Sequence, residues 1–227
     1  MKKYLILVLL SLFAAGLLAQ AGDELFWAAD QSLIIMPTAY TMPQGMHAFT
    51  NLELAILQYA YAATNRTHLS AGMVFPFTKD MIKTFTAGVK TSFYKSDQVQ
   101  AAVIGSFNPH TRAGYGAIVS SFGNPDISMH LMASELYNFK NGENQAMFAL
   151  GGIKRIGERF SGIMECYVIP QELGDFSDDP DALQFAIVLG ARFKGHKISW
   201  DIGIGRALGI DMGDFIGIPA LKATFLF

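Results

Sequence analysis

The chain has 227 residues, of which 51% are hydrophobic and only 16% are charged, and its formal net charge is −2. Soluble domains usually contain about 25% charged residues, so this chain has too little charge to cover a soluble surface of its size. A nucleic-acid partner is not expected, because it would call for a basic face. Cys166 is the only cysteine, which excludes an intramolecular disulfide. The length fits one domain.

Residues 1–21 have the layout of a secretory signal peptide. Lys2 and Lys3 precede an apolar stretch at 4–18, and the tripeptide Ala-Gln-Ala at 19–21 is a small-x-small cleavage site. The apolar stretch is shorter than the ~20 residues that a membrane-spanning helix needs. We therefore expect residues 1–21 to be removed during export.

Residues 22–45 are irregular, because Pro37 and Pro43 interrupt any regular element. Their apolar part is short, running from Ser32 to Met36. We expect a periplasmic segment that either plugs the lumen of the following domain, adds a strand to it, or packs at its rim.

From residue 46 to residue 227, short segments alternate between apolar and small or polar residues. In one of them, Phe185, Ile187 and Leu189 alternate with Gln184, Ala186 and Val188. Period two is typical of a strand, because successive side chains face opposite sides of a sheet. We expect strands near 46–54, 56–63, 66–75, 82–94, 98–107, 113–122, 127–137, 145–155, 160–169, 183–193, 197–207 and 216–227.

Each of these segments is close to the ~9–11 residues of a tilted transmembrane strand. After the signal peptide, no apolar run is long enough for a spanning helix. Backbone groups in lipid must pair internally, which leaves the closed barrel as the membrane architecture. We predict an all-β, closed, antiparallel, up-and-down transmembrane barrel of about 12 strands over residues 46–227.

Aromatic spacing and turn lengths support a membrane barrel over a soluble sandwich. Phe85 and Phe93 are eight residues apart, as are Phe185 and Phe193. Eight residues rise roughly 20 Å after tilt, close to the ~25 Å apolar band that aromatic girdles flank. Short turns alternate with longer connections such as 171–182, and in these barrels the short turns are periplasmic.

The chain ends on alternating apolar residues that finish on an aromatic: Leu221, Ala223, Phe225 and Phe227. Together with the signal peptide and the even strand number, this ending resembles the Gram-negative outer-membrane β-barrel proteins. The resemblance covers nearly the whole mature chain and concerns architecture. It implies a location in the outer membrane, contact with membrane lipid and lipopolysaccharide, and recognition of the last strand by the barrel-assembly machinery.

Charged residues of both signs are expected on the inward face of this barrel. The predicted lumen-lining residues are Glu53, His68, Lys90, Glu165, Arg192, Asp201, Arg206 and Lys222. Barrels of ~8 strands are filled by side chains, whereas 16–18 strands leave an aqueous channel. About twelve strands lie between these limits. The expected function is therefore that of a monomeric passive channel for a small solute, or of a narrow structural or binding barrel.

Two further functions stay open from the sequence. An outer-membrane lipid-modifying hydrolase would use Ser128 and His130, with Glu165 as the group that orients the histidine. This pair resembles the His-x-Ser arrangement of lipid A deacylases in reversed order. The alternative is that Ser128 and His130 are simply two polar residues facing the lumen, so we expect no enzyme.

The other function that the sequence leaves open is that of a soluble exported barrel around an apolar ligand. No cofactor and no metal site are expected, since the acidic stretch 172–181 lacks the spacing of a calcium loop.

Overall fold

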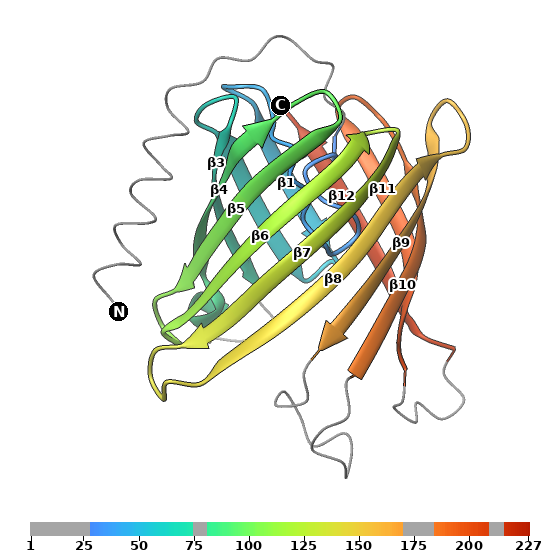
Figure 1. Ribbon diagram of the computed structural model, residues 1–227. Helices are drawn as coiled ribbons and strands as arrows, with labels where there is room; N and C mark the ends of the chain where they lie inside the picture. The colour runs from blue at the N-terminus through green and yellow to red at the C-terminus, as the bar shows by residue number, and fades with distance from the viewer. Residues whose placement is uncertain (1–27, 75–80, 170–183, 209–215) are drawn as a thin grey trace.

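The computed structural model describes residues 28–74, 81–169, 184–208 and 216–227. The strands in these ranges form a closed antiparallel barrel in which neighbours in the chain pair with each other and β1 closes on β12 (Figure 1). The predicted closed barrel of about 12 strands is confirmed. The strands are β1 (His47–Leu52), β2 (Ile56–Ala62), β3 (Thr67–Val74), β4 (Thr86–Lys95), β5 (Val99–Asn108), β6 (Ala113–Asn124), β7 (Ile127–Asn138), β8 (Asn144–Arg155), β9 (Phe160–Ile169), β10 (Gln184–Phe193), β11 (Ile198–Leu208) and β12 (Ile218–Leu226).

The main difference from the expected strands lies before β4. The strand expected at 82–94 starts later, because Met81–Thr84 form a short 3-10 helix, η1. The hydroxyl of Thr84 accepts the backbone N–H of Val74 at 2.9 Å, and this bond caps the end of β3. Across the described ranges, no helix is long and apolar enough to cross a membrane. The predicted signal peptide and the acidic stretch 172–181 lie outside the described residues.

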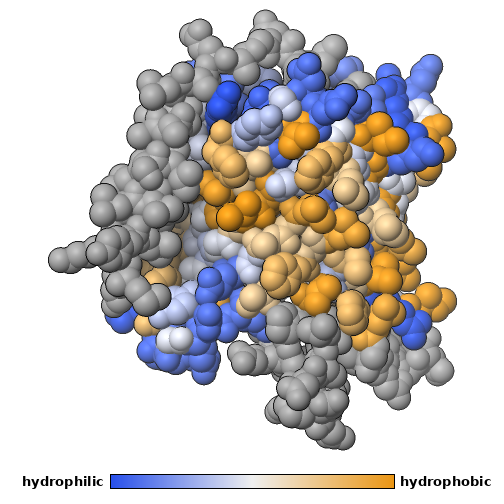
Figure 2. Space-filling model, in the orientation of Figure 1, coloured by the Kyte–Doolittle hydropathy of each residue, from blue (hydrophilic) through white to orange (hydrophobic). Residues whose placement is uncertain are grey.

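The outer surface of the barrel carries large apolar side chains. Figure 2 shows a hydrophobic band between more hydrophilic ends. Ile118, Phe148, Leu189 and Ile202 on this face each expose at least half of their surface. A soluble protein rarely leaves an apolar area of this kind uncovered, whereas a membrane barrel presents it to lipid. The outer face therefore argues against the soluble ligand-carrying barrel.

The two rims of the barrel differ in their connections. Short turns at 63–66, 96–98, 125–126, 156–159 and 194–197 lie at the rim where Phe227 ends the chain. This end of the barrel, at the top of Figure 1, is called the near rim, and the opposite end is the far rim. In outer-membrane barrels, short turns of this kind lie on the periplasmic side. The part of the lumen next to the near rim is called the near half, and the part next to the far rim is called the far half.

The segment before β1 lies inside the barrel. The N–H of Ala28 donates to the carbonyl of Gly195, and the N–H of Gly45 donates to the carbonyl of Ala62, so both ends of the segment lie at the near rim. Between them, Ser32 and Pro37 pair across a tight turn. The segment is drawn in blue within the barrel in Figure 1. Residues 28–45 are called the plug, and they add no strand to the sheet that the structure describes.

Candidate functional site: the plugged lumen

Apolar side chains of the plug occupy space that glycines leave on the wall. Leu33 and Ile34 are at most 2% exposed. A Cβ atom on Gly151 would overlap Cδ1 of Leu33, and one on Gly190 or Gly203 would overlap Cδ1 of Ile34. The plug side chains therefore pack directly against the wall backbone at these glycines, and at Gly190 and Gly203 a Cβ would also overlap a carbonyl oxygen of the neighbouring wall strand. Full burial of such side chains stabilises by about 1.5–3 kcal/mol each.

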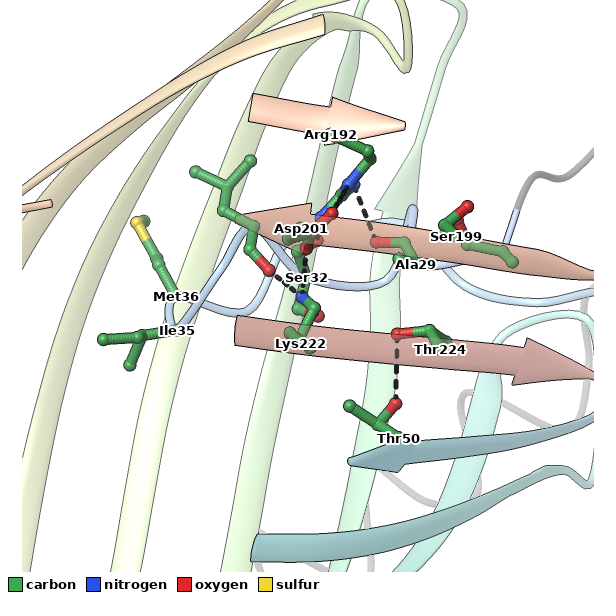
Figure 3. Close-up of polar contacts among 12 residues, drawn as sticks. Ala29, Ser32, Ile35, Met36, Thr50, Arg192, Ser199, Asp201, Lys222 and Thr224 are labelled. Carbon is green, nitrogen blue, oxygen red and sulfur yellow. Dashed lines mark hydrogen bonds and ion pairs between the residues drawn. The ribbon is translucent and has the colours of Figure 1, made fainter. Parts of the chain in front are cut away.

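Three charged side chains meet at adjacent positions of β10, β11 and β12 (Figure 3). Arg192 binds Asp201 in a bidentate manner, with its Nε 2.7 Å from Oδ1 and its Nη2 2.8 Å from Oδ2. The Nζ of Lys222 lies 3.0 Å from Oδ2 of the same carboxylate. All three side chains are at most 3% exposed. Bidentate pairing of this kind is strong and directional, so the triad is a fixed feature of the wall.

The remaining donors of the triad bind the plug. Arg192 donates from Nη1 to the carbonyl of Ala29 at 2.9 Å and from Nη2 to that of Ser32 at 2.7 Å. Lys222 donates to the hydroxyl of Ser32 at 3.0 Å and to the carbonyl of Leu33. Buried charges are tolerated only when their hydrogen-bonding capacity is used. The triad has two cations and only one carboxylate. The N–H groups that do not bind the carboxylate therefore need the carbonyl oxygens of the plug as hydrogen-bond acceptors.

Glu165 on β9 binds the same plug turn with the opposite polarity. Its carboxylate accepts the backbone N–H groups of Ile35 and Met36, at 3.1 and 3.2 Å, and the hydroxyl of Tyr167. The wall thus contacts both the carbonyls and the N–H groups of the turn. These contacts explain why charges of both signs occur on the inward face.

Two residues on β3 and β4 hold the arms of the plug. Lys90 donates from Nζ to the carbonyl of Gln31 at 3.1 Å. Nε2 of His68 accepts the N–H of Met42 at 2.6 Å, so this nitrogen carries no proton. The plug is therefore anchored on both sides of the barrel, to β3 and β4 as well as to β9–β12.

Ser128 and His130 contact each other, as the hydrolase hypothesis requires. Ser128 Oγ lies 2.9 Å from Nε2 of His130, while Nδ1 lies 2.7 Å from Oγ of Ser121. Ser121 also accepts the N–H of Ala39 in the plug at 2.8 Å. The group that orients the imidazole is thus a hydroxyl, and the carboxylate of Glu165 binds the plug instead. Sequence reasoning had no signal for Ser121, which lies on the neighbouring strand.

The structure brings six of the expected lumen residues to the inward face around the plug: His68, Lys90, Glu165, Arg192, Asp201 and Lys222. Two others lie elsewhere, and both expectations are corrected. Glu53 lies in the β1–β2 turn, where its Oε1 accepts the N–H of Leu221 at 2.7 Å. Arg206 is exposed on the outer face, because it shares the parity of Trp200 and Ile204 along β11.

The C-terminal strand presents its expected apolar side chains outward. Phe225 packs against Trp200 with ring centroids 6.5 Å apart, and Phe227 stacks on His47 at 5.7 Å. Ala223 lies opposite Trp200, and Leu221 lies opposite Ile202. β12 therefore closes the barrel with an aromatic cluster at the near rim.

The far half of the lumen is different in character. Its described inward positions carry no charged side chain. Most are small or apolar, namely Ile104, Ser106, Ala113, Tyr115, Ala117, Met132, Ser134, Met147, Ala149, Tyr167, Ala186, Val188, Gly205, Ala207 and Ala220, and Asn138 and Gln145 are larger polar exceptions. Ile35, at the tip of the plug, is 51% exposed. Figure 3 shows its side chain directed along β12 away from the near rim. Ile35 is therefore the solvent-accessible end of the plug on the side of the far half.

Little space remains between the plug and the near-half wall. A cavity of about the size of one water molecule separates Asp30 and Thr38 of the plug from His130, Ile153 and Arg192 of the wall. At this place the plug and the wall leave no room for a solute larger than water.

No protein-family model matches the sequence, and no curated protein matches it. Solved structures with a similar fold are outer-membrane barrels. A membrane protein studied for in-meso crystallisation shares 9% identity, with a TM-score of 0.51 and coverage of 81% of this chain and 83% of that chain. OmpF of Salmonella typhi shares 12%, with a TM-score of 0.43 and coverage of 76% and 62%. The toluene transporter TbuX of Ralstonia pickettii shares 9%, with a TM-score of 0.40 and coverage of 82% and 88%. At these identities the likeness concerns the fold alone.

Proposed function

We propose that this protein is a passive channel for small solutes in the outer membrane, closed by its own plug in the conformation described. The observation that carries the proposal is the origin of the material that fills the near half. A purely structural barrel of small diameter fills its lumen with side chains of its own wall. Here glycines such as Gly151 and Gly190 face inward, and a separate segment of chain occupies the space.

The contacts of the plug are of a kind that water can replace. Most polar contacts run from wall side chains to backbone groups of the plug, for example from Arg192 to Ala29 and from Lys90 to Gln31. A hydrogen bond of this type contributes about 0.5–3 kcal/mol net, because both partners bind water when separated. Movement of the plug would leave the strand ladders of the barrel intact. The plug can thus move without breaking the hydrogen bonds of the barrel, which supports its role in opening and closing the lumen.

The test is ion conductance in planar bilayers, with and without residues 22–44. The full chain should be closed with at most brief openings, and the deletion variant should conduct steadily. Resistance of the folded barrel to SDS, seen as a mobility shift on heating, verifies that the deletion variant is assembled. An assembled deletion variant that gives no current steps would reject the channel and leave a structural barrel.

The 2.9 Å contact between Ser128 and His130 supports a second candidate, a lipid-modifying hydrolase. Both residues are buried beneath the plug, so catalysis would also require the plug to move. Substitution Ser128→Ala, assayed for turnover of phospholipid and lipopolysaccharide acyl chains, tests this function. Hydrolysis that is undetectable, or equal in both proteins, would reject it.

The proposed surroundings follow from the outer face. Membrane lipid and lipopolysaccharide are the proposed partners of the apolar band, which includes Phe148 and Leu189. The barrel-assembly machinery is the proposed partner of β12 during insertion, supported by the outward series that ends on Phe227.

A further inference from the structure

The barrel wall is low over the hairpin formed by β1 and β2. These strands have 6 and 7 residues, whereas β6, β7 and β8 have 12 each. At ~3.4 Å per residue and a tilt of ~40°, β1 rises about 16 Å from the near rim, which is less than the ~25 Å apolar band. Glu53 and Leu54 close the hairpin tightly, both with positive φ. The turn therefore lies within the apolar band instead of at the far rim.

β12 continues past this turn toward the far rim. β1 pairs with β12 only along residues 222–226, whereas β12 begins at Ile218. Above the turn, residues 218–221 pair with β11 on one side, and no described strand pairs with the other edge of residues 218–220. This interruption, bounded by residues 218–221 of β12 and by the turn at 53–55, is called the gap.

The backbone at the edge of the gap is adapted to a missing neighbour. Glu53 satisfies both backbone groups of Leu221: its N–H donates to the carbonyl at 2.8 Å, and its carboxylate accepts the N–H at 2.7 Å. The next residue that points to the same side is Pro219, since alternate residues of a strand share a side. Proline has no N–H to leave unpaired. Unpaired donors are costly in a hydrocarbon layer, and this edge presents none between 219 and 221.

Apart from Glu53, the described side chains next to the gap are apolar and accessible. Ile56, Val74 and Ile218 face inward by their register, and they are 44%, 41% and 66% exposed. Leu54 in the turn is 70% exposed. These residues line the passage between the uncharged far half of the lumen and the outside of the wall.

We propose that the gap is a lateral portal through which uncharged, apolar small molecules pass between the far half of the lumen and the hydrocarbon layer of the membrane. The portal rests on the proposed function in that a channel also needs the far half to be accessible to solutes, and it does not require the plug to open. The described side chains at its edge favour uncharged solutes, because they are apolar apart from Glu53, whose carboxylate is bound to the backbone of β12.

Tryptophan quenching in lipid vesicles tests the portal on the full chain. In a background with Trp27→Phe and Trp200→Phe, Ile56→Trp places the fluorophore at the gap. The control Met147→Trp places it on the inward face of β8, which is paired on both sides. Phospholipids brominated on their acyl chains should quench Ile56→Trp several-fold more strongly than Met147→Trp. Equal quenching of the two variants would overturn the portal.

Passage of a small molecule is measured with the same variants. Bromohexane dissolved in the bilayer should quench Met147→Trp as well, because it can travel through the gap to the far lumen. Absence of that quenching, while Ile56→Trp is quenched, would overturn passage. Aqueous iodide should reach both positions from the far rim. If iodide reached neither, the open far half of the lumen would be wrong, and with it the shared premise of the portal and the channel, independently of any result on lipid access.

Discussion

The near and far halves of the lumen are built by the same strands and yet have opposite chemistry. In the near half, charged side chains such as Arg192 and Glu165 are fully buried and bind the plug. In the far half, the described inward positions are uncharged, and the plug ends at Ile35, which remains half exposed. The boundary between the halves coincides with the tip of the plug.

Small inward residues have two structural roles in this barrel. Gly151 and Gly190 leave room that Leu33 and Ile34 occupy, so they form a docking surface. At Gly205, farther along β11, an added Cβ would meet Val188 and Ile218 of the wall and no atom of the plug. A barrel that conducts needs both a surface on which the plug closes and a stretch of wall that the plug does not touch.

The largest effect is expected from filling one of the glycine pockets. Gly151→Leu would place its side chain where Leu33 and Met36 lie, with no close backbone atom on the wall in the way. Overpacking costs about 1–3 kcal/mol, so the open probability in planar bilayers should rise about 5- to 150-fold.

Gly116→Leu is the matched control for this variant. Gly116 lies on the same barrel, in β6, where an added Cβ meets open space. Its substitution should leave the open probability unchanged. Equal opening in the two variants would show that the plug does not dock on Gly151.

A smaller effect should locate the boundary between the halves at the plug tip. Ile34 is 2% exposed and Ile35 is 51% exposed. In a Cys166→Ser background, a water-soluble thiol reagent should label Ile35→Cys about 10-fold faster than Ile34→Cys, because Ile34 reacts only after local opening. Similar labelling rates would mean that the far half does not reach the plug tip.

The smallest effect concerns pH and the near rim. Burial alone would raise the pKa of Asp126, but hydrogen bonds and charge interactions from Lys194 and Arg155 outweigh it and hold the pKa below its ordinary value. The resulting stabilisation is present above the unfolded pKa of about 3.9 and is lost as the pH falls through the folded pKa. Since the carboxylate is 41% exposed, solvent screening limits it to about 0–1 kcal/mol.

Urea unfolding at pH 7 and pH 3 measures this contribution. The midpoint of the wild-type protein should fall slightly more between the two pH values than that of Asp126→Asn. An identical pH dependence in the two proteins would show that the Asp126 contacts do not stabilise the near rim.

Local sequence patterns were sufficient to predict the strands that form the wall of the barrel. Alternation along residues 183–193 and 197–207 gave both strands within one residue of their observed ends, because period two is a property of each strand alone. The same alternation, applied strictly, also predicts that Arg206 points outward, because Arg206 and the outward Trp200 are an even number of residues apart. Glu53 was misplaced because a turn breaks the alternation that would have assigned its face.

What the sequence by itself determined is therefore the strands, their closure and the direction of their side chains. The plug was decided only by the tertiary structure. Glu165 binds the N–H of Ile35 across 130 positions of sequence, and no periodicity in either segment specifies that contact. Partner choice for a buried charge depends on which groups the closed barrel brings together. The sequence specified an inward face of mixed charge, and the folded chain alone shows that its own N-terminal segment is the ligand of that face.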